Sequence, residues 1–274
     1  MGIWVTCPLH MKGKAAREME LLFDEYAEKL YGIKTEDGPA DGSDDDEGDI
    51  EAAIQKEIGA LKDKNKGSSN DNGVFNEVRI NQECLLFMRC KPPVEPVEFS
   101  RRICQDAATG SHSARARYLN RLTPVSVIAK ASETGLEEAT RKALAGHLKL
   151  QPKDVKADAA STEKDGETED AEEALGPFTF AIRPSIRNHN TLQRDDVITR
   201  IASLIDPQHK VNLGSPDKVI LVEVYQTICG MSVVPGDWDT LKKYNLTELY
   251  KQANSGKTEP ESDSSKPANK SNEA

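Results

Sequence analysis

The chain has 274 residues, of which 37% are hydrophobic and 5% aromatic, and its formal net charge at pH 7 is −10. This composition supports a hydrophobic core of modest size. It excludes a chain that is folded along its whole length, because roughly a third of the residues are too polar and charged to be buried. No apolar run approaches the ~18 residues of a membrane-spanning helix, and the first residues have a strand pattern in place of a signal peptide.

The negative charge is concentrated in two segments. Residues 35–72 carry a net charge of −8 and residues 151–176 a net charge of −6, whereas residues 251–274 are neutral. The rest of the chain holds 25 basic and 21 acidic residues, so the part expected to fold is mildly basic. All three segments are polar and poor in apolar residues, and we predict that they are mostly disordered.

The first half of the chain predicts the element order βαββαβ, which is the ferredoxin-like arrangement. Alternating apolar residues indicate the strands, and apolar residues at helical spacing indicate an amphipathic helix that ends at Gly32. A second helix is expected over 97–107. The expected strands are 3–7, 74–80, 84–90 and 117–122.

The second half predicts another α+β unit. Thr134 and Glu137 form a capping box that begins one helix, and Asp195 and Asp196 lie in the first turn of another, where the helix dipole favours acids. Runs rich in Val and Ile indicate central strands of a sheet that these helices cover. The expected strands are 177–183, 219–225 and 228–234.

Known catalytic and cofactor-binding patterns are missing from the sequence. It contains no GxGxxG or GxxxxGK[ST] phosphate loop, no GxSxG elbow, and no HExxH or CxxC metal motif. The five cysteines are odd in number and lie mostly in apolar strands, which is typical of reduced core thiols in an intracellular protein. We therefore predict no catalytic residue, no metal and no cofactor.

One polar segment is rich in hydrogen-bond donors. Between the strand that ends at Arg183 and the helix that begins near Arg194, the chain carries Arg187, Asn188 and His189. Guanidinium and amide groups, together with the amides of a helix N-terminus, are the donors that bind a nucleic-acid backbone. A polar surface loop that caps a helix fits the same composition, so both interpretations stay open.

A second basic set surrounds the strand expected at 117–122. Arg117 and Arg121 are four residues apart, and strand alternation places them on one face. A solvated face and an RNA-contacting face fit this pattern equally well.

Together these runs resemble a THUMP domain. The runs that carry the resemblance are Arg117–Val125, Phe180–His189, Val219–Val224 and Cys229–Val234. The last two runs are the most specific part of the resemblance, because a Val-Glu-Val strand leads to a Gly-Met-Ser-Val-Val strand. The amino-terminal Gly-Ile-Trp-Val-Thr-Cys run narrows the resemblance to eukaryotic tRNA acetylation adaptors, the Tan-type tRNA acetyltransferase subunits, and it covers about residues 2–34 and 74–250.

The resemblance implies a function that the residues alone do not reveal. THUMP domains preceded by a ferredoxin-like domain bind tRNA through its acceptor end and its shape. Tan-type proteins work with a separate RNA cytidine acetyltransferase, which uses acetyl-CoA and ATP, to make N4-acetylcytidine in the D-arm of serine and leucine tRNAs. We therefore expect a non-catalytic adaptor without a cofactor, whose partners are tRNA and the acetyltransferase and which does not bind membranes. The expected location is the nucleus or nucleolus, with the cytoplasm as the alternative.

Carried over by position, the resemblance also implies domains and RNA contacts. The expected RNA-binding residues are Arg183, Arg187, Asn188 and His189, with Arg117 and Arg121 as secondary contacts to the RNA backbone and 3′ end. The expected domains are a ferredoxin-like domain over 1–34 and 74–122 with a disordered insert at 35–73, a THUMP domain over 123–238 with a disordered insert at 151–176, a helix over 239–250 and a disordered tail over 251–274.

Two other functions fit the sequence. The chain could itself modify tRNA, which requires a cofactor pocket and predicts binding of acetyl-CoA. It could also be a general RNA-binding interaction module in RNA processing or ribosome assembly, which predicts equal affinity for tRNA and other folded RNAs at matched salt.

Overall fold

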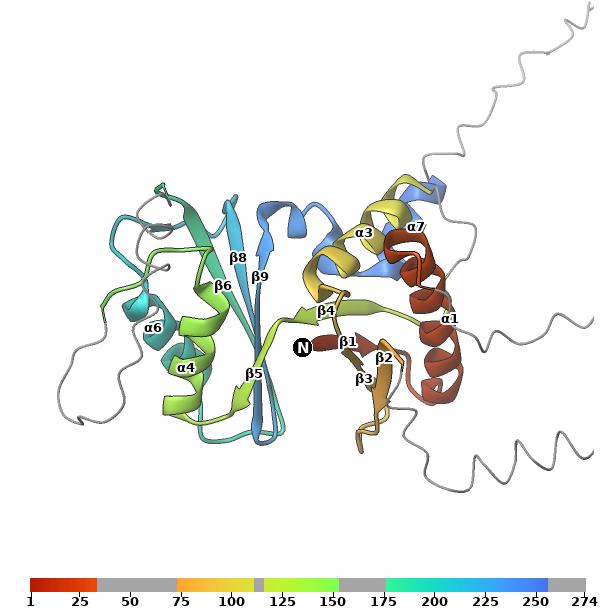
Figure 1. The fold of residues 1–274 in the computed structure, drawn as a ribbon, viewed down its shortest axis with the longest axis horizontal. Helices are drawn as coiled ribbons and strands as arrows, with labels where there is room; N and C mark the ends of the chain where they lie inside the picture. The colour runs from red at the N-terminus through yellow and green to blue at the C-terminus, as the bar shows by residue number, and fades with distance from the viewer. Residues whose placement is uncertain (34–72, 111–115, 153–175, 256–274) are drawn as a thin grey trace, which may run out of the picture.

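The computed structural model describes residues 1–33, 73–110, 116–152 and 176–255, which form two sheets packed against each other (Figure 1). The segments predicted to be disordered lie almost wholly outside the described residues. Residues 251–255 are an exception, because they continue the last helix where a tail was predicted.

The first sheet has four antiparallel strands in the order β2-β3-β1-β4, with helices α1 and α3 on one face. Its elements are β1 Gly2–Thr6, α1 Lys12–Tyr31, β2 Phe75–Val78, β3 Leu85–Cys90, α3 Pro96–Thr109 and β4 Arg121–Val125. This order is the ferredoxin-like arrangement, as predicted. Helix α1 ends at Gly32, whose φ of 66° lies in the left-handed region that glycine adopts without steric cost.

Alternation along β1 gives the first sheet two different faces. Ile3 and Val5 are buried under the helices with Phe23 and Phe99, whose ring centroids lie 5.2 Å apart. Trp4 points to the opposite face, where it packs against side chains of the second sheet. The helix-free face of the first sheet is therefore the one that meets the second sheet.

The second sheet has five strands in the order β5-β9-β8-β6-β7. Its elements are β5 Val127–Lys130, α4 Glu133–Leu144, β6 Thr179–Arg187, α6 Arg194–Leu204, β7 Lys210–Val211, β8 Lys218–Tyr225 and β9 Ile228–Pro235. Strand β6 runs parallel to β8, and β9 runs antiparallel to both β8 and β5. Helices α4 and α6 cover one face and bury Val222 and Val224 of β8.

The last part of the chain returns to the first sheet. After the short turns η1 (Gly236–Trp238) and η2 (Lys242–Tyr244), helix α7 (Leu246–Ser255) packs against α3. The prediction of one helix over 239–250 is therefore wrong. Lys242, Lys243 and Tyr244 have φ angles of 52°, 56° and 58°, so three consecutive residues adopt the left-handed conformation and interrupt any right-handed helix there.

Three other local predictions are corrected by the structure. The N-cap of α4 is Ser132, whose hydroxyl accepts from the backbone N–H of Gly135, in place of Thr134. Strand β6 continues to Arg187 through residues expected to form a loop. Strand β7 pairs only with its first two residues, so in the described part of the chain the edge beside Pro184 has no partner strand and tolerates proline. Strand β4 begins at Arg121, so strand alternation does not relate Arg121 to Arg117.

The chain passes directly from one sheet to the other at Ser126. Strand β4 ends at Val125 and β5 begins at Val127, so the boundary expected between 122 and 123 falls inside β4. The Ser232 hydroxyl donates to the backbone oxygen of Pro124 at 2.7 Å. A Cβ atom on Gly230 would lie 2.9 Å from Cγ1 of Val125, so the close contact of β4 with β9 requires glycine at 230.

A buried histidine lies at the base of the segment between α4 and β6. The backbone nitrogen of Lys149 is 2.8 Å from Nε2 of His209, and that of Phe178 is 3.1 Å from Nδ1. Burial lowers the pKa of His209, which favours the neutral ring. A neutral ring has one acceptor nitrogen, so it accepts from one of these N–H groups while lying between the two points at which the chain leaves and re-enters the second sheet.

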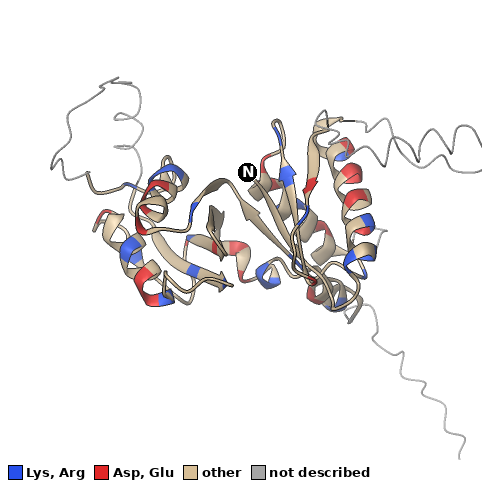
Figure 2. Ribbon diagram, turned by 90° about the horizontal axis from the view of Figure 1, so that it is seen from below, with Lys and Arg blue, Asp and Glu red and all other residues tan. Residues whose placement is uncertain are grey.

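Charged residues lie mostly on the helices, and the strands carry few of them (Figure 2). Within the described ranges, no helix combines the length and the apolar character needed to cross a membrane.

Candidate nucleic-acid interface

Three polar side chains project from one face of β6. Phe180 and Ile182 point toward α4 and α6, so the alternate residues Arg183, Ser185 and Arg187 lie on the opposite face. Their partners on β8 are Leu221, Glu223 and Tyr225, and Tyr225 packs against Trp4 of the first sheet. The two arginines predicted from the sequence are therefore on the face that meets the first sheet.

A buried carboxylate connects arginines from both sheets. Glu223 is 9% exposed, and its Oε2 accepts from Nη1 of Arg187 at 2.8 Å. Burial raises the pKa of Glu223 above its ordinary value, and the charge of Arg187, a hydrogen bond from Ser185 and the charge of Arg121 oppose that rise. Arg121 comes from β4, so the first sheet contributes to the same charged site. We call Arg121, Arg183, Arg187 and Glu223 the arginine cluster.

Arg183 is held at the other end of the arginine cluster. Its Nη2 donates to the backbone oxygen of Leu213 at 2.9 Å and lies 3.9 Å from Oδ2 of Asp239, while its buried Nε has no hydrogen-bond partner among the described residues. The other oxygen of Asp239 is 4.0 Å from Nζ of Lys243, an exposed residue of the left-handed turn. Lys243 and Asp239 thus extend the site, although the sequence marks neither residue.

The cluster keeps an excess of positive charge. Four cations, including Lys243, face the two carboxylates of Glu223 and Asp239. The side chains of Arg183 and Arg187 remain 28% and 38% exposed, so an anion can reach them. Guanidinium groups held by a buried acid are ordered donors for a phosphate backbone.

His189 and Asn188 organise the loop beyond β6. The backbone N–H of Leu192 donates to Nε2 of His189 at 2.9 Å, so Nδ1 carries the proton and donates to the backbone oxygen of Gln226 at 2.6 Å. Asn188 has a φ of 52° and donates to the side chain of Gln82 at 3.3 Å. Both residues use polar groups within the protein, and their predicted RNA contacts stay predictions.

Arg117 lies outside the arginine cluster. Its side chain is exposed, and its backbone N–H donates to Glu18 of α1 in the segment before β4. The structure therefore brings together Arg121, Arg183 and Arg187 from the predicted set and leaves Arg117 separate.

The described residues offer little for covalent or metal chemistry. Burial raises the pKa of Cys90 to about 12 and that of Cys229 to about 11, so both stay protonated thiols near neutral pH. Among the described residues, no group of three or more His, Cys, Asp or Glu side chains could hold a metal ion. The arrangement is suited to binding an anion.

Comparison with known proteins assigns the family. The model of the THUMP domain family matches residues 156–234. The tRNA acetyltransferase TAN1 of Saccharomyces cerevisiae is 30% identical over 263 residues, which cover 91% of this chain and 84% of that protein. The chain belongs to the TAN1 family. This result confirms the resemblance that the sequence runs carry.

Other relatives of this TAN1-family chain are more distant. The uncharacterized protein C25H2.10c of Schizosaccharomyces pombe is 27% identical, covering 94% of the chain and 79% of that protein. THUMP domain-containing protein 1 of Mus musculus is 26% identical, covering 94% and 67%. The crystal structure of PH1313 from Pyrococcus horikoshii Ot3 matches with a TM-score of 0.41 at 11% identity, over 85% of the chain and 54% of that protein, a likeness too remote to support an argument.

The residues matched by the THUMP domain model include only part of the arginine cluster of this TAN1-family chain. Arg183, Arg187 and Glu223 lie within the matched residues, whereas Arg121 precedes them and belongs to the ferredoxin-like sheet. The cluster is thus assembled from both halves of the molecule.

Proposed function

We propose that this protein is a tRNA-binding adaptor that presents serine and leucine tRNAs to a separate RNA cytidine acetyltransferase, which forms N4-acetylcytidine in the D-arm. The observation that carries the proposal is the arginine cluster, in which Arg121 from one sheet and Arg187 from the other approach the same buried carboxylate of Glu223. A cationic site spanning two domains can contact phosphates that lie on different parts of a folded RNA.

The chemistry of the cluster favours recognition of the RNA backbone and shape. Arginine binds phosphate oxygens through two parallel N–H groups, and such contacts release counterions, so affinity falls steeply as salt is raised. Folded RNA is recognised largely through its phosphates, its 2′-hydroxyls and its shape. We therefore expect strong salt dependence and a preference for folded tRNA over other RNAs of equal length at matched salt.

The relatives support a role in tRNA acetylation. The name of the Saccharomyces cerevisiae relative combines tRNA with acetyltransferase activity, and this chain shares most of its length. In our proposal the transferase chemistry belongs to the separate enzyme, and this chain supplies tRNA binding.

The first test is nucleoside mass spectrometry of tRNA from cells with and without the gene. Selective loss of N4-acetylcytidine from serine and leucine tRNAs is expected, with the other modified nucleosides unchanged. Persistence of that nucleoside would refute the acetylation role, and any other nucleoside that disappeared would define the replacement.

Reconstitution then separates an adaptor from an enzyme. The purified chain with acetyl-CoA, ATP and tRNA should form no N4-acetylcytidine, whereas adding the RNA cytidine acetyltransferase should restore it. Product formation by the chain alone, accompanied by saturable binding of acetyl-CoA, would show that the chain is itself the catalyst.

A further inference from the structure

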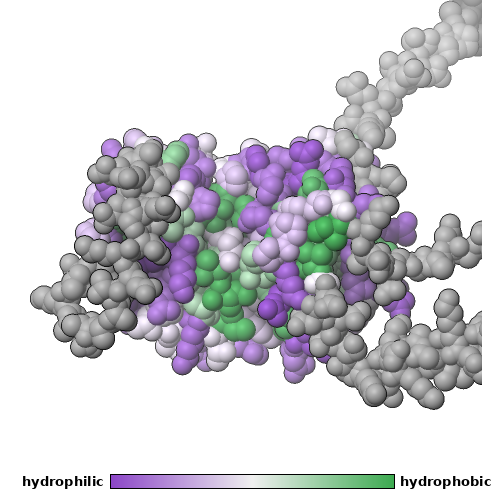
Figure 3. All heavy atoms as spheres, viewed as in Figure 1, coloured by the Kyte–Doolittle hydropathy of each residue, from purple (hydrophilic) through white to green (hydrophobic). Residues whose placement is uncertain are grey.

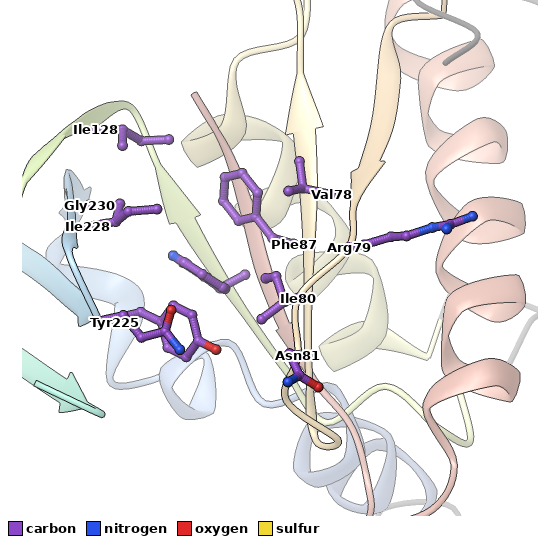
Figure 4. Close-up of a pocket in the computed structure, with 11 residues that line it drawn as sticks. Val78, Arg79, Ile80, Asn81, Phe87, Ile128, Tyr225, Ile228 and Gly230 are labelled. Atoms are coloured by element: carbon purple, nitrogen blue, oxygen red, sulfur yellow. The ribbon is translucent and has the colours of Figure 1, made fainter. Parts of the chain in front are cut away.

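An apolar pocket lies at another opening between the two sheets (Figure 4). It has a volume of about 280 Å³, and Figure 4 shows Val78, Ile80 and Phe87 of the first sheet opposite Ile128 and Ile228 of the second. Apolar side chains also gather over the middle of this face in Figure 3.

The pocket gathers apolar side chains that remain exposed. Ile128, Val78 and Ile228 are 45%, 41% and 41% exposed, although isoleucine and valine are normally among the most buried residues. Single exposed apolar residues are common, but a contiguous group around a cavity marks a site of interaction. The three residues come from β5, β2 and β9, so the group is created by the junction of the two sheets.

The position of the pocket separates it from the arginine cluster. In the first sheet, β2 is one edge strand and β4, which carries Arg121, is the other. In the second sheet, β5 is an edge strand at the pocket, and β6, which carries Arg183 and Arg187, lies beyond β9 and β8. The pocket therefore extends toward the edges opposite the cluster, and the two come closest at Tyr225, which lines the pocket and pairs with Arg187 of β6.

The shape of the pocket favours a protein side chain over an RNA base. The rings of Trp4, Phe87 and Tyr225 are only 5%, 7% and 6% exposed, and Trp4 is tilted against the other two at centroid distances of 4.7 and 5.6 Å. No open aromatic face is left on them for stacking a base, which is how single-stranded RNA is usually held. The accessible walls are mainly aliphatic, with Asn81 and Gln226 as polar neighbours, and the volume suits one or two apolar side chains.

The charges around the pocket indicate an acidic occupant. Register places Arg89 on the same face as Phe87, and alternation places Lys130 on the same face as Ile128. Both cations are exposed, and neither makes an ion pair among the described residues. The guanidinium of Arg79, the charged residue that lines the pocket, points away from it toward α1 (Figure 4).

We infer that this pocket, with Arg89 and Lys130 beside it, is a docking site for a segment of a partner protein in which one or two apolar side chains are flanked by carboxylates. The apolar side chain fills the pocket, and the carboxylates pair with the two cations. The inference rests on the proposed function in one respect, because the partner that an adaptor requires is the acetyltransferase.

The first experiment tests the chemistry without any assumption about the partner. Two fluorescent peptides are titrated into the intact chain, each with a central Phe and Leu, one flanked by glutamates and the other by lysines. The glutamate-flanked peptide should bind at least tenfold more tightly, and Ile128→Glu should weaken its binding at least tenfold. The control Leu21→Glu introduces the same charge at a 59% exposed leucine on α1 and should change affinity less than twofold.

The cations are tested in the same assay. Arg89→Glu with Lys130→Glu should invert the preference, so that the lysine-flanked peptide binds more tightly. Equal binding of both peptides to the unmodified chain, or failure of both to bind, would overturn the inference. Circular dichroism and thermal melting check that each variant is folded, and Ile228→Glu replaces Ile128→Glu if the latter unfolds.

The second experiment uses the purified RNA cytidine acetyltransferase. Ile128→Glu should weaken its association with the chain at least tenfold while leaving tRNA binding within twofold. Unimpaired association in that variant would refute docking of the enzyme at this pocket. If the unmodified chain binds the glutamate-flanked peptide and not the enzyme, the adaptor proposal fails and the docking site stands.

These measurements also test two other occupants of the pocket, RNA and a second copy of the chain. Loss of tRNA binding in Ile128→Glu, with peptide binding absent, would assign the pocket to RNA. Concentration-dependent dimerisation of the unmodified chain in sedimentation experiments, abolished by Ile128→Glu, would assign it to a second copy of the chain. Either result would overturn the inference.

Discussion

The junction of the two sheets has two openings of different chemistry. At one, Arg121 and Arg187 lie beside the buried carboxylate of Glu223 and Arg183 lies near Asp239, and at the other, Ile128 and Val78 leave aliphatic surface in contact with water. A buried acid orders long cationic side chains while leaving them hydrated, whereas exposed aliphatic groups lower the free energy only when a partner covers them. Our two proposals assign a different class of partner to each opening, so variants at the two openings should have different effects.

The largest expected effect removes the cationic opening. Arg183→Ala with Arg187→Ala should weaken tRNA binding by roughly 1–3 kcal/mol in total and flatten the dependence of log K on log salt, because two phosphate contacts are lost. Filter binding at several salt concentrations measures both quantities.

A matched control for this variant is Arg17→Ala with Arg200→Ala, which removes equal charge from exposed positions on α1 and α6. Equal weakening by both double variants would show that net charge, and not the arginine cluster, governs RNA affinity.

The second-largest effect is expected at the contact of β4 with β9, which joins the two sheets. Gly230→Ala places a methyl group 2.9 Å from Cγ1 of Val125, so the Val125 side chain or the two strands must shift, and the free energy of unfolding should fall by roughly 1–3 kcal/mol. Chemical denaturation measures the loss. Gly13→Ala, where a Cβ meets no atom within 4 Å, is the control and should not destabilise the protein. A loss equally large at Gly13 would show that the β4–β9 contact is not the cause.

A smaller effect increases the positive charge of the arginine cluster. Glu223→Gln removes the acid between Arg187 and Arg121 and should tighten tRNA binding by about 1 kcal/mol at low salt. Burial raises the folded-state pKa of Glu223, so its contribution to stability is present below its ordinary pKa and declines as pH rises through the folded value.

The Gln variant should therefore lack that decline when the free energy of unfolding is compared from pH 4 to pH 8. Weaker tRNA binding by a folded Glu223→Gln protein would indicate that ordering of Arg187 outweighs its free charge.

A still smaller effect concerns the left-handed turn. Lys243→Gly and Lys243→Ala both remove the charge near Asp239, and tRNA affinity should fall equally in the two. Lys243→Gly should nevertheless be the more stable protein by about 1 kcal/mol, because glycine adopts a φ of 56° without a Cβ clash. Thermal melting separates them, and equal stability would contradict the left-handed assignment.

The smallest effect is expected at Arg117. Arg117→Ala should change tRNA affinity and stability by about 0.5 kcal/mol or less, because this exposed residue lies apart from both openings. An effect as large as that of the cluster variants would place a second RNA contact on the segment before β4.

Periodicity and turn residues predicted the frame of the molecule. Runs rich in Val and Ile identified β8 and β9, and Gly32 marked the end of α1. The same reasoning ended β6 at Arg183, because Pro184 is a strand breaker unless one edge of the strand has no partner, and strand pairing is a property of the whole sheet.

The site was predicted only in part because it depends on distant contacts. Arg183 and Arg187 stood out by composition, but nothing in the sequence marked Glu223 as their partner, and its link to Arg121 requires that two sheets meet. The sequence did not mark Lys243, since no local pattern predicts three left-handed residues in succession. The apolar pocket likewise combines residues from strands that are far apart in the chain.

His209 has a consequence for how proteins of this family can differ in length. Its ring lies within 3.1 Å of the backbone nitrogens of Lys149 and Phe178, so the two ends of the segment between these residues lie close together. The entropy of closing a loop rises only with the logarithm of its length, so insertions or deletions between these ends cost little stability. This site is therefore a natural point for grafting a tag or reporter without disturbing either sheet.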